Sequence, residues 1–147
     1  FDLTYDILIY PRHLSVACEL VSRFPQQRFV LDHIAKPPIR SGTLSPWREG
    51  VWRLAEYPHV YCKISGMVTE ADWEAWQPEV LRPCLDVVFE AFGTQRIMIG
   101  SDWPVCTVAA SYAQVIELFY EYVAQFPIPE QADVCGGNAQ RFYRLAR

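Results

Sequence analysis

Apolar β-type segments alternate along the chain with segments of helical periodicity, and this alternation constrains the fold more than any other feature. The segments that resemble strands are 4–10, 28–33, 60–65 and 96–101. Each is followed by apolar residues at helical spacing, bounded by Pro, Gly or Ser. No two-residue hairpin signal joins any two of the strands. The order predicts parallel strands joined by crossover helices, in one α/β domain over residues 1–147.

Capping and breaking residues mark where the helices begin and end. Pro11 opens the first helix, and Phe24 is expected on its buried face. Ser45 is expected to cap the second helix, with Pro46 at the first helical position. Ser111 predicts the start of a later helix.

Composition excludes several classes of function. The formal net charge is -4 and the basic residues are scattered, which argues against a surface for nucleic-acid phosphates. No apolar stretch is long enough to cross a bilayer, and no signal-peptide pattern is visible. The 5 cysteines are odd in number and never form Cys-x-x-Cys, which argues against a disulfide framework or a zinc knot. We expect a cytoplasmic protein with reduced thiols and a small-molecule substrate.

A carboxylate follows the last strand-like segment, in Gly100-Ser101-Asp102-Trp103-Pro104. Parallel α/β folds place their chemistry at the carboxyl ends of the strands. A carboxylate there is costly unless it is hydrogen-bonded, paired or bound to a metal. Asp102 is therefore either a structural cap of the turn that follows it or a functional group.

Strand parity predicts which side chains share a cavity. In the third strand the apolar residues at alternate positions face the helices, which leaves Lys63 and Ser65 pointing inward. Placing His33, at the end of the second strand, and Asp102 inward as well is consistent with the alternation but is not required by it. An acid–base group, a cation, a hydroxyl and a carboxylate would then converge, a set that can activate water and stabilise an oxyanion.

Three motifs, in order, resemble the amidohydrolase-related family. They are Leu31-Asp32-His33-Ile34-Ala35-Lys36-Pro37, Tyr61-Cys62-Lys63-Ile64-Ser65-Gly66 and Gly100-Ser101-Asp102-Trp103-Pro104-Val105, and the closing Gly136-Gly137-Asn138-Ala139 is similar as well. The resemblance covers nearly the whole chain. It is nearest to the sugar-lactonase and 2-pyrone-4,6-dicarboxylate lactonase branch of amidohydrolase family 2. It implies a (β/α)8 TIM-barrel hydrolase, of which this chain carries the C-terminal four β/α units, since a whole barrel needs about 250 residues.

The resemblance also implies roles for particular residues. Asp102 matches the last-strand aspartate, which would handle the proton of the water that attacks a lactone. His33 matches a middle-strand histidine, which would bind a metal or polarise the lactone carbonyl. The residues expected to bind substrate are Lys36, Lys63, Ser65 and Trp103.

One family feature, the His-x-His pair of the first strand, is missing from this sequence. Two alternatives are therefore equally open. The full-length protein could hold a divalent metal such as zinc, bound by His33 and Asp102 with further ligands, or it could hold no metal at all. We expect the chain to need its missing N-terminal half or a second copy as partner, and to be inactive alone.

Other hypotheses stay open. Lys63 could cross the barrel to pair with Asp6 or Asp102, and Lys36 could pair with Asp32. The chain could also be a non-catalytic α/β module that binds a ligand or associates with itself. Within the same superfamily, decarboxylation or amide hydrolysis are further alternatives.

Overall fold

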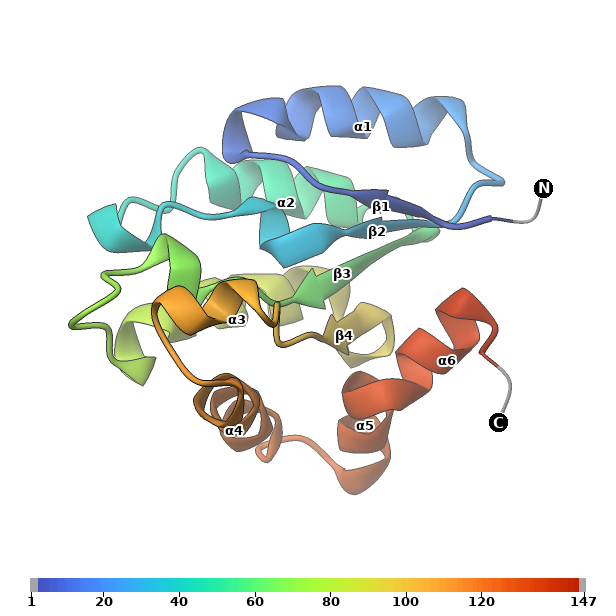
Figure 1. The fold of residues 1–147 in the computed structure, drawn as a ribbon. Helices are drawn as coiled ribbons and strands as arrows, with labels where there is room; N and C mark the ends of the chain where they lie inside the picture. The colour runs from blue at the N-terminus through green and yellow to red at the C-terminus, as the bar shows by residue number, and fades with distance from the viewer. Residues whose placement is uncertain (1–2, 146–147) are drawn as a thin grey trace.

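Figure 1 shows the computed structural model, which describes residues 3–145. Its centre is a parallel sheet in the order β1-β2-β3-β4, which confirms the predicted crossover topology. The strands are β1 Tyr5–Ile7, β2 Phe29–Leu31, β3 Val60–Ile64 and β4 Ile97–Ile99. The predicted domain of residues 1–147 includes four terminal residues, 1, 2, 146 and 147, that lie outside the described part.

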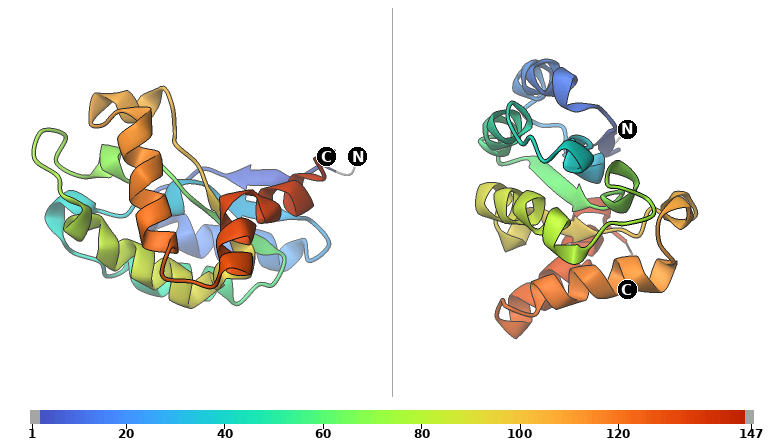
Figure 2. Two further views of the ribbon diagram at one scale, coloured as in Figure 1. Left: turned by 90° about the horizontal axis from the view of Figure 1, so that it is seen from below. Right: turned by 90° about the vertical axis from the view of Figure 1, so that its left-hand side faces the viewer.

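Helices cover one face of the sheet and close its last edge. They are α1 Leu14–Arg23, α2 Trp47–Ala55, α3 Pro78–Phe92, α4 Tyr112–Val123, α5 Ile128–Ala132 and α6 Asn138–Tyr143. α1, α2 and α3 stack side by side on one face (Figures 1 and 2). α4 lies beside α3, and α6 lies toward the amino ends of the strands. Among the described residues, no helix is both long and apolar enough to cross a membrane.

Side chains on the two faces of the sheet pack into separate clusters. The residues of β3 that face α2 and α3 are Val60, Cys62 and Ile64, and all are fully buried. On the other face, Val30 and Met98 pack against Phe142 of α6. The alternation predicted for the third and fourth strands is therefore present, and Lys63 lies on the inner face of the sheet beside Asp6.

Two of the predicted helix details are wrong. Phe24 is 54% exposed, because α1 ends at Arg23 and the chain leaves the helix before Phe24 could turn inward. The second helix has Pro46 rather than Ser45 as its cap residue. Arg48 N–H donates to the carbonyl of Leu44 over 2.9 Å, so main-chain atoms close the first turn and no serine cap is needed.

The predicted cap of α4 is confirmed. Ser111 Oγ accepts a hydrogen bond from Gln114 N–H over 3.3 Å, and Gln114 Oε1 accepts from Ser111 N–H over 2.9 Å. This reciprocal pair satisfies main-chain donors that the first turn of a helix leaves without partners.

Buried hydrogen bonds fasten the amino ends of the strands. The Arg96 guanidinium donates to three main-chain carbonyls between the end of α2 and the start of β3, those of Ala55, Tyr57 and Val60. Asn138, which is fully buried, donates from Nδ2 to the carbonyls of Thr94 and Ile97 over 2.7 Å each. Arg28 donates to the carbonyl of Phe142, which ties α6 to the same end.

The β1 edge of the sheet carries an apolar groove of about 350 Å³ beside α1. Its lining residues are Tyr5, Ile7, Leu8, Ile9, His13, Val16, Ala17 and Leu20. Tyr5, Leu8 and Val16 are exposed. A β-strand edge next to apolar side chains is a surface that another strand and helix can cover.

Candidate active site

A left-handed turn carries His33, and this overturns the parity argument made from the sequence. β2 ends at Leu31, so His33 is not a strand residue and its direction does not follow strand alternation. Residues 33–36 all have positive φ angles, between 46° and 58°. His33 therefore reaches the inner side of the sheet from the turn.

The turn is costly for residues with side chains and is held from several sides. A left-handed conformation costs non-glycine residues roughly 1–2 kcal/mol each, so the neighbours must enforce it. Lys36 N–H donates to the carbonyl of His33 over 2.8 Å. The buried indole of Trp47 donates from Nε1 to the carbonyl of Ile34 over 2.7 Å. Strained backbone of this kind is concentrated at functional sites.

His33, Ser65 and Asp102 lie together at the carboxyl ends of the strands. His33 Nδ1 lies 2.8 Å from Ser65 Oγ, in hydrogen-bond contact. His33 Nε2 lies 3.7 Å from Asp102 Oδ1, and both of these side chains are 17% exposed. That distance is too long for a hydrogen bond, but an oxygen atom could lie about 2.8 Å from both groups. The two side chains are thus placed to share a water molecule or a substrate oxygen.

Asp102 directs its carboxylate at His33 rather than at its own turn. The residue has a φ of 58°, and its main-chain carbonyl accepts the hydrogen bond from Cys106 N–H over 2.9 Å. The side chain of Asp102 therefore lies toward His33, while its main-chain carbonyl closes the turn.

Gly66 makes room for this pair, a role that sequence reasoning missed. Its φ is +62°, and a Cβ atom built there would lie 2.8 Å from His33 Nδ1 and 3.1 Å from Asp102 Oδ2. A side chain at position 66 would therefore strain the backbone and displace both groups. The signal available in the sequence was a glycine directly after Ser65, at the end of a strand.

Carboxylates neutralise both lysines of the predicted site. Lys63 Nζ lies 2.6 Å from Asp32 Oδ1 and 3.1 Å from Asp6 Oδ2, so pairing with Asp6 is confirmed and pairing with Asp102 is not. Burial lowers the pKa of Lys63, but hydrogen bonding to Asp32 and the charge of Asp32 outweigh it, and the net pKa is raised.

Lys36 pairs with Glu70 rather than with Asp32. Its Nζ lies 3.3 Å from Glu70 Oε1 and 5.6 Å from the centre of the Tyr10 ring. Trp103, also predicted to bind substrate, is 65% exposed beside Asp102. The sequence analysis did not anticipate Glu70 as the partner of Lys36 or Asp32 as a partner of Lys63, although Asp32 belongs to a motif already singled out.

Negative charge dominates the site. Among the described residues of the site, carboxylates outnumber ammonium groups two to one; they are Asp6, Asp32, Glu70 and Asp102 against Lys36 and Lys63. Such a balance disfavours anionic ligands and favours neutral or cationic ones.

The donor set falls short of a zinc site. His33 Nε2 and Asp102 Oδ1 are atoms of the kinds that bind zinc, but catalytic zinc usually has three protein ligands. Among residues 3–145, no three His, Cys, Asp or Glu side chains converge where a metal could bind. A metal at this position would need ligands from beyond the described residues.

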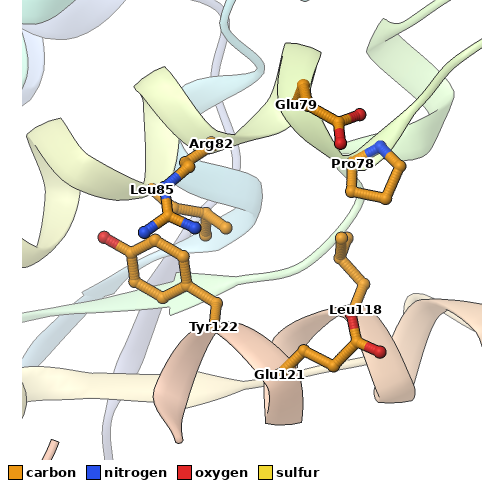
Figure 3. A pocket seen from close by; sticks show the side chains of 7 residues that line it. All are labelled: Pro78, Glu79, Arg82, Leu85, Leu118, Glu121 and Tyr122. Atoms are coloured by element: carbon orange, nitrogen blue, oxygen red, sulfur yellow. The ribbon is translucent and has the colours of Figure 1, made fainter. Parts of the chain in front are cut away.

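A separate cavity of about 130 Å³ lies between α3 and α4, away from His33 and Asp102 (Figure 3). Figure 3 shows the Arg82 guanidinium beside the Tyr122 ring, and its carbon lies 5.4 Å from the ring centre. Tyr122 donates its hydroxyl proton to Asp86 over 2.7 Å. These contacts tie the two helices together beside the cavity.

Comparison with known proteins finds relatives that match nearly the whole of this chain. A family model described as amidohydrolase matches residues 1–145. L-fucono-1,5-lactonase of Burkholderia multivorans is 41% identical over 154 residues, which cover 98% of this chain and 52% of that protein. The chain thus spans about half the length of the curated relatives that it matches.

Solved structures agree with this comparison. A zinc-bound amidohydrolase from Burkholderia multivorans superposes with a TM-score of 0.93 at 39% identity, covering 97% of this chain and 53% of that one. A putative 2-pyrone-4,6-dicarboxylic acid hydrolase from Pseudomonas putida gives a TM-score of 0.77 at 19% identity, covering 97% and 52%, and shares the fold. The four parallel β/α units are consistent with the C-terminal half of such a barrel.

Proposed function

Because this chain belongs to the amidohydrolase family, we propose that it supplies half of a barrel that opens a lactone by hydrolysis. The observation that carries the proposal is the 3.7 Å between His33 Nε2 and Asp102 Oδ1 at the carboxyl ends of the strands. The 41% identity to an L-fucono-1,5-lactonase supports the choice of a lactone.

In the proposed reaction, Asp102 is the general base and His33 the electrophile. Asp102 takes a proton from water as the water oxygen forms a bond to the lactone carbonyl carbon. With Ser65 O–H donating to Nδ1, His33 presents Nε2–H, which stabilises the developing oxyanion. The ring C–O bond then breaks, and the proton held by Asp102 passes to the ring oxygen. The product is a hydroxy acid.

Ser65 holds His33 in this proposal. Although the sequence analysis placed Ser65 against substrate, its side chain is 1% exposed and lies behind the imidazole. Lys36 and Trp103 remain candidates for substrate contacts at the rim.

We propose that the substrate is a neutral, hydroxyl-rich lactone rather than a dicarboxylate lactone. The excess of carboxylates over ammonium groups would repel an anionic substrate. The ion pair of Lys36 and Glu70 offers both donors and acceptors, which suits sugar hydroxyls. The same excess of negative charge would favour release of the carboxylate product.

A divalent metal enters the proposal only for a complete barrel. A bound metal would supply Lewis-acid polarisation of the lactone carbonyl. Because His33 and Asp102 alone do not make a metal site, the proposed reaction uses only side chains of this chain. The missing ligands would come from the other half of the barrel, whose first contact we place at the apolar groove beside β1.

Asp102→Asn in the complete-barrel protein tests the proposal. Loss of a general base should lower kcat for lactone opening by about 10²–10⁴-fold, with little change in thermal stability. Asp72→Asn is the matched control, because Asp72 pairs with Arg40 over 3.6 Å on the surface. Lactone opening at the unaltered rate in Asp102→Asn would overturn the assignment.

A further inference from the structure

Two carboxylates hold the ammonium group of Lys63. An ammonium group has three N–H donors. Two of them meet Asp32 Oδ1 at 2.6 Å and Asp6 Oδ2 at 3.1 Å. Tyr143 donates to the same Asp6 Oδ2 over 2.9 Å. Lys63 therefore uses most of its hydrogen-bonding capacity within the protein.

These contacts join three strands and the last helix. Lys63 belongs to β3, Asp6 to β1, and Asp32 follows β2, while Tyr143 is the last residue of α6. The ammonium lies on the inner face of the sheet, and its side chain is only 22% exposed. A partly buried charge of this kind requires its partners, because burial without them is costly.

Asp32 connects this cluster to the site. It is the residue directly before the left-handed turn of residues 33–36. The 2.6 Å contact with Lys63 is charge-assisted, a class of bond roughly twice as strong as a neutral one. It fixes the chain at the point where the backbone changes from extended to left-handed, one residue before His33.

We propose that Lys63 is a positioning residue: it holds Asp32, and through Asp32 it aims the imidazole of His33 at Asp102. The inference rests on the proposed function, since it assigns a part in that reaction. In this role Lys63 does not bind substrate, as the sequence analysis expected, but acts through Asp32 on His33.

The test separates kcat from KM in the complete-barrel protein. Lys63→Met should lower kcat by about 10–100-fold, as expected for a displaced reacting group, and leave KM within about threefold. Lys63→Arg keeps a cation for Asp32 and should recover most of kcat. Asp32→Asn, which leaves the cation in place, should lower kcat in the same way and keeps the test valid where Lys63→Met does not fold.

Imidazole ¹⁵N spectra give a second reading that does not depend on turnover. In Lys63→Met and Asp32→Asn, the ring signals of His33 should move toward those of a ring without a hydrogen bond at Nδ1. Arg40→Met, at an exposed cation that pairs with Asp72 over 3.6 Å, serves as the control, with the His33 signals unchanged.

A raised KM with unchanged kcat in Lys63→Met would overturn the inference, as would unaltered His33 signals in Asp32→Asn. Failure of the proposed function is a separate outcome, because it would appear as full activity in Asp102→Asn whatever the Lys63 variants do.

Discussion

At the amino ends of the strands, Arg96 and Asn138 donate hydrogen bonds of 2.7 to 3.1 Å to main-chain carbonyls. At the carboxyl ends, His33 and Asp102 face each other across 3.7 Å, and both have positive φ. One end of the sheet is saturated with hydrogen bonds between protein groups. The other holds functional groups apart on strained backbone.

The difference suggests how stability is distributed in this fold. Left-handed residues cost free energy, and a group that must meet a substrate leaves some of its hydrogen-bonding capacity unused. The buried bonds at the amino ends can offset such costs, because they satisfy carbonyls that would otherwise be buried alone. Substitutions at the two ends should therefore separate stability from activity.

The largest loss of stability should follow Asn138→Leu. One buried carbonyl and one part-buried carbonyl would lose their donor, which we expect to cost about 2–4 kcal/mol of unfolding free energy in chemical denaturation. The exposed Gln140 on the same helix is the control, and Gln140→Ala should change stability by less than about 0.5 kcal/mol. If the folded fraction of Asn138→Leu also lost most of its activity, substitutions at the amino ends would not separate stability from activity.

A smaller loss of stability, joined to a loss of activity, should follow Gly66→Ala. Its positive φ costs a side chain about 1–2 kcal/mol, and the new methyl would also push His33 away from Asp102. Gly93→Ala is a close control, since Gly93 has a φ of +65° but its built Cβ meets nothing within 4 Å. Both variants should lose stability, and only Gly66→Ala should lose turnover. Equal turnover in the two would contradict the steric argument.

Trp47→Phe should loosen the turn that carries His33. It removes the indole donor to the carbonyl of Ile34, at an expected cost of about 1–2 kcal/mol. Trp52→Phe, at a residue that is 42% exposed, should cost almost nothing. Hydrogen exchange at residues 33–36 would report the loosening, and unchanged protection there would show that other contacts hold the turn.

The smallest effect is in thiol reactivity and needs no substitution. Burial raises the pKa of Cys84 to about 12 and raises the pKa of Cys62 and Cys106, so few thiolates form at pH 8. The exposed Cys135 should react first with a thiol reagent. Among the buried thiols Cys62, Cys84 and Cys106, we expect Cys106 to react first, because it lies four residues after Asp102 and the strained end of the sheet opens more readily than the core. Mass spectrometry would identify the modified thiols. If Cys62 were modified before Cys106, the carboxyl ends of the strands would not open more readily than the core.

Local patterns predicted the frame of this molecule. Apolar residues recur with a period of two residues in the strands and about 3.6 residues in the helices, and these patterns extend over whole elements. They predicted the four β/α units and the inward direction of Lys63. The sequence also predicted the start of α4 at Ser111, because the cap depends on two residues that are three positions apart.

The inner arrangement of the site was beyond such patterns. Nothing in the run from His33 to Lys36 marks a left-handed turn, because none of its residues is glycine and the conformation is imposed by Trp47 and Lys63 from elsewhere in the chain. The pairing of Lys36 with Glu70 likewise joins residues 34 positions apart. Strand alternation is not what brings His33 near Asp102, because the left-handed turn after β2 does so.

The turn over residues 33–36 is, in effect, a short piece of mirror-image helix. At φ 50° and ψ 35° for His33, and φ 46° and ψ 32° for Ile34, its backbone has the angles that a D-amino acid adopts in its own favoured helix. A chemically synthesised segment with D-alanine at position 35 would therefore fit there more comfortably than the natural L-alanine, whose φ is 58°. For these few residues, the protein works against the chirality of its own building blocks, and it does so beside the histidine on which its proposed chemistry depends.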